Sequence, residues 1–184
     1  MSYEFARLEM LIGENGIQKL KGSSVAIFGI GGVGSYSAET LARSAVGKII
    51  LVDFDKISES NINRQIHSLK STVGLNKAEV MGERIKDINP ECEVIKEINL
   101  LKENNIKEFF EKYNPDFVID AIDMVKTKAM LIEYCSQNNI NIISSMGFGN
   151  KIQKKDAYVQ YEKEITVEDL VRYAGIRQEI GGRI

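Results

Sequence analysis

The segment Gly29-Ile30-Gly31-Gly32-Val33-Gly34 is the first part of the sequence whose residue types could bind a ligand. It follows an apolar run and precedes a stretch with helical spacing. Backbone N–H groups at a helix start have no partner within the helix, and together with the helix dipole they attract phosphate. Gly29, Gly31, Gly32 and Gly34 are therefore candidate nucleotide-binding residues. The alternative is that these glycines serve only close packing of the helix on the sheet.

An acidic residue beyond the glycine turn favours the nucleotide. Asp53 ends the next predicted strand, about 20 residues after the turn, where a carboxylate can accept hydrogen bonds from ribose hydroxyls. Taken alone, this spacing is also typical of nicotinamide-dependent dehydrogenases.

Two cations narrow the choice of nucleotide. Arg64 and Lys77 follow the second predicted strand. A nicotinamide cofactor, whose diphosphate the glycine turn already holds, does not require both of them, whereas a triphosphate does. Charge-assisted hydrogen bonds of this kind are worth about 1.5–3 kcal/mol each. The alternative for each residue is a solvated surface cation.

Asp120 and Asp123 lie at the end of the fourth predicted strand. The carboxyl edge of a parallel sheet is where open α/β folds bind ligands, and a carboxylate there can hold Mg²⁺ against a polyphosphate. We expect Asp120 to lie within the strand and to be structural, and Asp123 to be the metal ligand. An ordinary helix cap ahead of Thr127 is the alternative for Asp123.

Alternating strands and helices must position these residues. Strands are predicted over residues 25–28, 48–53, 93–98, 117–121 and 140–144. Helices are predicted from the glycine turn to about residue 45 and over residues 77–88, 105–113 and 127–137. The alternation predicts an α/β fold with a Rossmann-like, mainly parallel sheet and helices on both faces.

Two regions fall outside this alternation. Residues 56–73 form a polar stretch with weak periodicity, and a loop of that length in a compact domain is usually functional or disordered. Residues 151–184 carry seven basic and six acidic residues without a clear continuation of the pattern. We therefore predict a nucleotide-binding domain over residues 1–150, with residues 151–184 as a divergent or incomplete C-terminal region of the same domain.

The composition limits the class of protein. The 184 residues suit one domain, and the formal net charge of -2 gives no bulk cationic field for nonspecific nucleic-acid binding. The first residues lack the basic region and apolar core of a signal peptide, and the sequence has no apolar run of membrane-spanning length. We therefore expect a cytoplasmic protein that does not associate with a membrane.

The cysteines and the histidine suggest no catalytic role. Cys92 and Cys135, the two cysteines of the chain, cannot build a zinc site from Cys-x-x-Cys pairs. We expect both to be buried, inert thiols. The single histidine, His67, is more in keeping with hydrogen bonding within the long loop than with catalysis, although a part in proton transfer stays open.

The ordered motifs resemble the ATP site of the ubiquitin-activating-like superfamily, which includes ThiF, MoeB and HesA. The matching pieces are residues 29–35, 53–55 and 60–65, Lys77 and Asp123. Within this superfamily, residues 63–69, 73–81 and 118–123 most resemble the TcdA-like tRNA threonylcarbamoyladenosine dehydratases. The resemblance covers about residues 3–150 and includes Arg7, which matches an arginine that relatives extend across a dimer interface toward the triphosphate.

This resemblance implies an ATP-dependent enzyme that uses Mg²⁺. A carboxylate on the threonylcarbamoyl group of a tRNA adenosine attacks the α-phosphate, and intramolecular attack on the resulting acyl adenylate closes a ring and releases AMP. The implied catalytic residues are Arg7, Arg64, Lys77 and Asp123. The implied nucleotide-binding residues are Gly29, Gly31, Gly32, Gly34, Asp53, Ser60, Asn61, Asn63, Arg64, Lys77 and Asp123, the last also carrying the metal. The implied partners are the modified tRNA, a second copy of the chain in a homodimer and a possible sulfur-transfer protein.

Two other functions stay open at this point. One is a ThiF-like or MoeB-like adenylyltransferase that activates the C-terminal Gly-Gly of a small sulfur-carrier protein. The other is a regulatory module that binds ATP or NAD without turnover. Residues 151–184 do not match the pattern of the dehydratases, in which the region after residue 150 contributes to the substrate side.

Overall fold

The computed structural model describes residues 3–145 and 159–160, which form one twisted sheet covered by helices. The strand order is β3-β2-β1-β4-β5-β6, and the first five strands in the chain are parallel to one another. The strands are β1 (Ser24–Phe28), β2 (Lys48–Val52), β3 (Glu93–Glu97), β4 (Phe117–Asp120), β5 (Asn141–Ser145) and β6 (Val159–Gln160). β6 is antiparallel to β5. The predicted mainly parallel sheet is confirmed.

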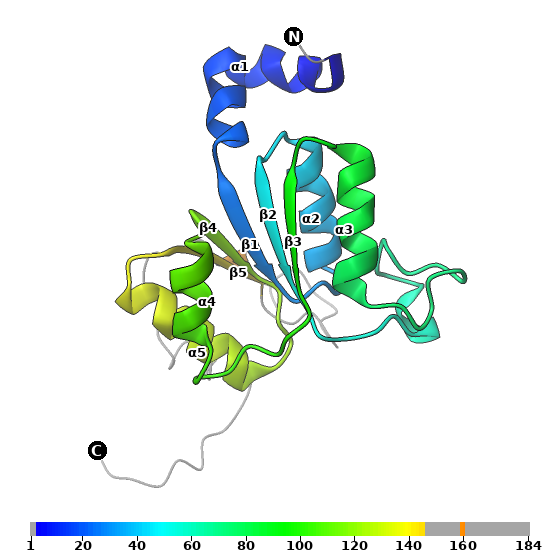
Figure 1. Cartoon of the computed structure of the whole chain (residues 1–184), viewed down its shortest axis with the longest axis vertical. Helices are drawn as coiled ribbons and strands as arrows, with labels where there is room; N and C mark the ends of the chain where they lie inside the picture. The colour runs from blue at the N-terminus through cyan, green and yellow to red at the C-terminus, as the bar shows by residue number, and fades with distance from the viewer. Residues whose placement is uncertain (1–2, 146–158, 161–184) are drawn as a thin grey trace, which may run out of the picture.

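Helices cover both faces of the sheet, as predicted (Figure 1). The helices are α2 (Gly34–Arg43), α3 (Lys77–Ile88), α4 (Ile106–Tyr113) and α5 (Val125–Gln137). Alternate residues of β1 serve the two cores. Ile27 packs with α2 and α3, whereas Phe28 packs with the aromatic residues of α4 and with α5. This burial on both sides explains why β1 and β2 are nearly continuous apolar runs.

The strand order places a crevice at the carboxyl end of β1. The chain leaves β1 toward β2 on one side and returns through β4 on the other side. Loops after neighbouring strands therefore diverge at this point, which is the usual ligand site of open α/β sheets.

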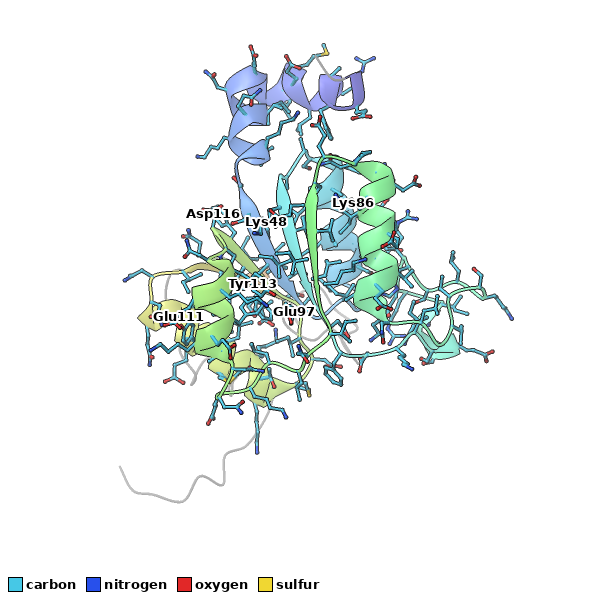
Figure 2. All side chains as sticks on the ribbon, in the orientation of Figure 1. Lys48, Lys86, Glu97, Glu111, Tyr113 and Asp116 are labelled. Atoms are coloured by element: carbon cyan, nitrogen blue, oxygen red, sulfur yellow. The ribbon has the colours of Figure 1, made fainter. Side chains whose placement is uncertain are left out.

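A polar contact joins β3 to α4 beside this crevice. The Tyr113 hydroxyl at the end of α4 donates a hydrogen bond to Glu97 at the end of β3, and Lys112 Nζ lies 3.3 Å from the same carboxylate (Figure 2). Burial raises the pKa of the Tyr113 hydroxyl, so the hydroxyl keeps the proton that it donates.

An N-terminal helix, α1 (Ala6–Lys21), was not predicted from the sequence. It follows a short 3-10 helix, η1 (Tyr3–Phe5), and projects beyond the end of the sheet at which β1 begins (Figure 1). Gly13, with φ of 72°, interrupts its helical geometry. Met10 and Leu11 are largely exposed, so this helix presents apolar surface to its surroundings.

The stretch from residue 56 to residue 73, whose length predicts a functional or disordered loop, is an ordered loop in the structure. It contains a 3-10 helix, η2 (Glu59–Asn61), and Lys56 forms an isolated bridge to Asn76 ahead of α3. The Asn61 Oδ1 atom accepts a hydrogen bond from the Ser58 N–H at 3.0 Å and so fixes the turn.

The predicted C-terminal region, residues 151–184, lies outside the described residues apart from the two residues of β6. Among the helices within residues 3–145, none is long and apolar enough to cross a membrane.

Candidate nucleotide-binding site

A cavity of about 830 Å³ opens at the carboxyl ends of the parallel strands. This volume is within the usual range for small-molecule sites. The site residues predicted from the sequence that line this cavity are Gly29, Gly31, Gly32, Asp53, Asn61, Arg64, Lys77 and Asp123. Residues spread over almost 100 positions of the chain therefore meet in one cavity.

Two glycines of the turn are required by close backbone approach. Gly29 has φ of +85°, and a Cβ there would lie 2.7 Å from the Ala121 carbonyl oxygen. A Cβ on Gly34 would lie 1.8 Å from the Gly29 carbonyl oxygen. Gly34 does not line the cavity, so its contribution in the structure is to let α2 start directly beneath the turn.

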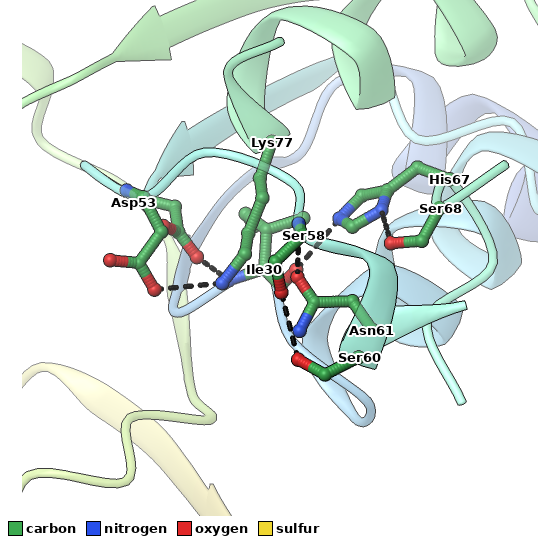
Figure 3. A network of polar contacts seen from close by, with 9 residues as sticks. Ile30, Asp53, Ser58, Ser60, Asn61, His67, Ser68 and Lys77 are labelled. Atoms are coloured by element: carbon green, nitrogen blue, oxygen red, sulfur yellow. Dashed lines mark hydrogen bonds and ion pairs between the residues drawn. The ribbon is translucent and has the colours of Figure 1, made fainter. Parts of the chain in front are cut away.

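Two side chains hold the peptide groups of Ile30 inside this turn. The Ile30 N–H donates to Asp53 Oδ2 at 2.6 Å, and His67 Nε2 lies 2.8 Å from the Ile30 carbonyl oxygen (Figure 3). Because a carbonyl can only accept, Nε2 carries the proton of the histidine. Burial lowers the pKa of His67, which favours the neutral ring. The geometry thus confirms His67 as a hydrogen-bonding residue of the loop.

The Asp53 carboxylate is arranged to accept further hydrogen bonds. Its Oδ1 atom accepts from the Asp55 N–H at 2.8 Å while its Oδ2 atom accepts from Ile30. Each carboxylate oxygen has a second lone pair, which a hydroxyl in the cavity could use. Burial raises the pKa of Asp53, and the two backbone N–H donors and the positive charge of Lys77 oppose that rise.

Lys77 is a buried cation at the start of α3. Its Nζ lies 2.7 Å from Asp55 Oδ2, and its side chain is 8% exposed. Figure 3 shows this side chain descending from α3 toward Asp53 and Ile30. Burial with one carboxylate partner holds the ammonium group at the cavity wall, where it could bind a phosphate.

Arg64 is held by two residues that sequence reasoning assigned to the ligand. Its Nη1 atom donates to the Ser60 carbonyl oxygen at 2.7 Å and to Asn63 Oδ1 at 3.1 Å. Ser60 and Asn63 do not line the cavity. In the structure they position the guanidinium group of Arg64. The Arg64 side chain passes within 3.7 Å of the Cβ position of Gly32.

Asp120, the last residue of β4, and Asp123, which follows the strand, have the different environments that the sequence predicts. Asp120 is fully buried, and its Oδ2 atom lies 2.6 Å from the Nζ of Lys128 of α5. Lys128 also donates to Ser144 Oγ at 3.2 Å and to the Ser145 carbonyl oxygen at 2.9 Å. Asp120 is therefore structural, whereas Asp123 is exposed and lines the cavity.

Arg7 lies apart from the cavity. It is exposed on α1, at the end of the sheet opposite the carboxyl ends of the strands (Figure 1). The chain on its own therefore does not bring Arg7 to the other predicted site residues.

Several lining residues were not predicted as site residues. Leu100, Leu101, Ile122 and Met124 form apolar parts of the wall, and Gln65 lines the end near the glycine turn. Gln65 stands inside a motif that the sequence singled out, whereas the apolar residues carry no signal that separates them from core positions.

Both cysteines are buried, as predicted, and neither lines the cavity. Burial raises the pKa of Cys92, and it raises the pKa of Cys135 to about 12. Such thiols stay protonated at neutral pH and are poor nucleophiles.

A comparison with protein families decides the relationship. The model described as the ThiF family matches residues 5–154. The chain belongs to the ThiF family. The expected superfamily is thus confirmed, and the cavity described above lies within the matched ThiF residues.

Individual relatives agree with this assignment. A tRNA threonylcarbamoyladenosine dehydratase of Bacillus subtilis is 50% identical over 151 residues, which are 82% of this chain and 59% of the relative. The adenylyltransferase and sulfurtransferase MOCS3 of Drosophila sechellia is 34% identical over 139 residues, 74% of this chain and 30% of that protein.

A solved structure shows the same arrangement of the ThiF fold. The crystal structure of Escherichia coli tRNA N6-threonylcarbamoyladenosine dehydratase, TcdA, in complex with ATP matches with a TM-score of 0.79 and 42% identity, covering 83% of this chain and 63% of that chain. This chain spans between 55% and 59% of the length of the bacterial dehydratases that it matches.

Proposed function

We propose that the protein binds ATP and uses it to adenylate the carboxylate of threonylcarbamoyladenosine in tRNA, which then cyclises. The observation that carries this proposal is the meeting of the glycine turn, a ribose-type carboxylate and two cations in one cavity. The relatives that bear the dehydratase name, including one solved with ATP, support the same substrate.

Each end of the cavity suits a different part of ATP. The second lone pairs of Asp53 would accept from the ribose hydroxyls, and the glycine turn would donate its backbone N–H groups to a phosphate. Arg64 and Lys77 would neutralise the remaining phosphate oxygens, and Asn61 also lines the cavity. The apolar side chains of Leu101 and Ile122 would contact the base.

The first chemical step forms a mixed anhydride. An oxygen of the substrate carboxylate attacks the α-phosphorus, the bond to the bridging oxygen of the β-phosphate breaks, and pyrophosphate leaves. Negative charge on the leaving group grows in this step, so cations held in advance at the site stabilise its transition state. Positioning by a rigid turn supplies the rest of the acceleration.

The second step needs no nucleophile from the protein. An atom of the neighbouring carbamoyl group attacks the activated acyl carbon, the bond to the AMP oxygen breaks, a ring closes, and an N–H proton of the carbamoyl group passes to the solvent. The net change in the tRNA is the loss of one water, whose oxygen stays on AMP. The burial of both cysteines is consistent with a reaction that does not use them.

Magnesium fits the site only together with phosphates. Within the described residues, no group of three or more metal-binding side chains is present. Mg²⁺ is commonly held by one or two carboxylates plus substrate phosphates and water. Asp123 would supply such a carboxylate, and the ion would neutralise charge on the triphosphate.

We also propose a homodimer, because Arg7 lies far from the cavity of its own chain. Since α1 lies at the far end of the sheet from the cavity (Figure 1), Arg7 could act on phosphates only in the site of a second copy. The exposed apolar residues Met10 and Leu11 on the same helix supply surface that such a contact would bury. The sulfur-transfer partner stays a prediction.

The test is ATP-dependent AMP release with tRNA that carries threonylcarbamoyladenosine. We expect AMP and pyrophosphate in equal amounts with this tRNA and neither product with tRNA that lacks the modification. Arg64→Ala should lower turnover at least 100-fold, because it removes a charge-assisted contact made to the reacting phosphates. AMP release that instead requires a small protein ending in Gly-Gly would support the carrier-protein adenylyltransferase and contradict the proposed substrate.

A further inference from the structure

One buried polar group in the cavity wall has no role in ATP binding as described above. Within the described residues, Gln65 Oε1 is the single buried side-chain oxygen or nitrogen without a hydrogen-bond partner. Gln65 is 6% exposed and lines the cavity. A buried acceptor without a donor costs about 1–3 kcal/mol, so it is usually retained for a purpose.

The position of Gln65 is fixed, whereas its amide group can turn. The Gln65 N–H donates to the Asn61 carbonyl oxygen at 3.0 Å, and the Gln65 carbonyl oxygen accepts from the Ser68 N–H at 3.0 Å. The side-chain amide lies against the glycine turn, with Nε2 3.8 Å from the Cβ position of Gly31. Rotation of the terminal amide therefore keeps it within reach of whatever the turn binds.

The phosphates of ATP offer no hydrogen-bond donor to Gln65 Oε1. Phosphate oxygens at neutral pH accept hydrogen bonds. The donors of ATP are its ribose hydroxyls, which Asp53 would accept, and the amino group of its base. The second substrate is a further source of the missing donor.

We propose that Gln65 recognises the N–H next to the reacting carboxylate of the acyl substrate. This inference rests on the proposed function, in which the substrate is an N-carbamoylated amino acid. In such a group the N–H is bonded to the carbon that carries the carboxylate. A carboxylate placed for attack on a phosphate at the glycine turn therefore brings the N–H close to Gln65.

The role of Gln65 is to orient the substrate. Oε1 accepts from the N–H and fixes which carboxylate oxygen points at the phosphorus. Nε2 remains free to donate to an oxygen of the substrate carboxylate. The amide thus holds the acyl substrate at two points, while ATP alone binds without it.

The experiment compares Gln65→Leu with the wild-type protein. Leucine is close in volume and cannot hydrogen-bond. At saturating ATP, we expect kcat/KM for threonylcarbamoyl-modified tRNA to fall about tenfold or more, the effect of one lost hydrogen bond in a buried site. The Kd for ATP, measured by calorimetry without tRNA, should change less than threefold.

Stability gives a readout that a merely structural role would not share. Because Oε1 has no partner in the free protein, Gln65→Leu should leave Tm unchanged or raise it, whereas loss of a structural hydrogen bond would lower Tm. Gln137→Leu, at an exposed glutamine of α5, is the matched control and should leave all three measurements unchanged.

Three results would overturn the inference. An unchanged kcat/KM for the tRNA would exclude contact with the acyl substrate, and an equal loss of ATP affinity would place Gln65 on the nucleotide instead. A lowered Tm with unchanged kinetics would make it structural. If the wild-type protein itself releases no AMP with modified tRNA, the proposed function fails first and the role of Gln65 fails with it.

Discussion

At the scale of single residues, the site depends on how a few side chains fix the glycine turn. Asp53 and His67 hold the N–H and the carbonyl group of Ile30 from opposite sides. With both groups fixed, the N–H groups that follow are held in place before a phosphate arrives. Such advance positioning avoids a cost of reorganisation when charge develops.

The neutral state of His67 gives a prediction about pH. Burial sets its pKa in the folded protein below the ordinary value of 6.5. The unfolded chain therefore binds a proton more readily than the folded protein. As a result, His67 does not reduce the unfolding free energy above about pH 6.5, and it reduces this free energy as the pH falls below that value. His67→Gln keeps a side-chain N–H donor and does not titrate. Between pH 7.5 and 5.5, the unfolding free energy measured with urea should fall more for the wild type than for the variant, by at most about 1.4 kcal/mol.

The same pH slope in both proteins would show that His67 does not stay neutral when folded. Calorimetry with ATP at pH 7.5 gives the matching functional readout. There the variant should retain affinity within about threefold, since the donor to Ile30 is kept.

The sequence alone predicted the lining residues that carry a charge or that must be glycine. It did not predict residues whose role depends on a partner far away in the chain. Lys128 reads as a surface cation on a helix, yet it is buried against Asp120, Ser144 and Ser145. Ser60 and Asn63 belong to a contiguous motif, and the structure shows that they support Arg64 from beside the cavity. A sequence motif can identify a site, but only the fold shows which of its residues line the cavity and which ones position those residues.

At the scale of elements, the glycine turn combines two different requirements. Gly34 is needed because α2 starts against the Gly29 carbonyl oxygen, whereas Gly31 has open space, with Gln65 Nε2 the nearest atom at 3.8 Å from its Cβ position. Glycine at position 34 is therefore needed for folding, whereas glycine at position 31 leaves space for the ligand.

Two alanine substitutions separate these requirements. Gly34→Ala forces backbone movement and should lower the unfolding free energy by about 3 kcal/mol or more. Gly31→Ala should leave stability within about 1 kcal/mol while weakening ATP binding at least tenfold, because its methyl group enters the space for phosphate. Thermal unfolding and calorimetry check both. Full stability of Gly34→Ala would contradict the close approach of α2.

The elements also show why one helix escaped prediction. Residues 25–144 alternate between apolar strands and helices, and every predicted element there was found, with ends that shifted by a residue or two. α1 has little apolar periodicity, because its buried surface is small and Met10 and Leu11 face outward. Gly13, with its positive φ, divides the pattern further. A helix with little buried surface leaves a weak signal in the sequence.

At the scale of the whole molecule, the proposed dimer would complete each site with Arg7 from the other copy. Arg7→Ala and Arg64→Ala should each be nearly inactive alone. In a mixture, heterodimers contain one site that lacks both arginines and one site that has both. Co-refolded equal amounts should therefore recover about a quarter of wild-type activity.

Light scattering of the wild-type protein should give the mass of two chains. Two results would contradict the shared site: a mixture as inactive as its components, or a fully active single chain. The control is a mixture of Arg7→Ala with wild type, in which activity should fall in proportion to the sites that contain the altered arginine.

We propose that this cavity drives the dehydration of a tRNA modification. The decisive measurement is mass spectrometry of nucleosides from threonylcarbamoyl-modified tRNA after incubation with the protein and ATP. We expect the modified nucleoside to lose one water, one AMP to form per nucleoside converted, and Asp123→Asn to form little of either product. An unchanged nucleoside mass in the presence of protein that binds ATP would rule out the proposed reaction.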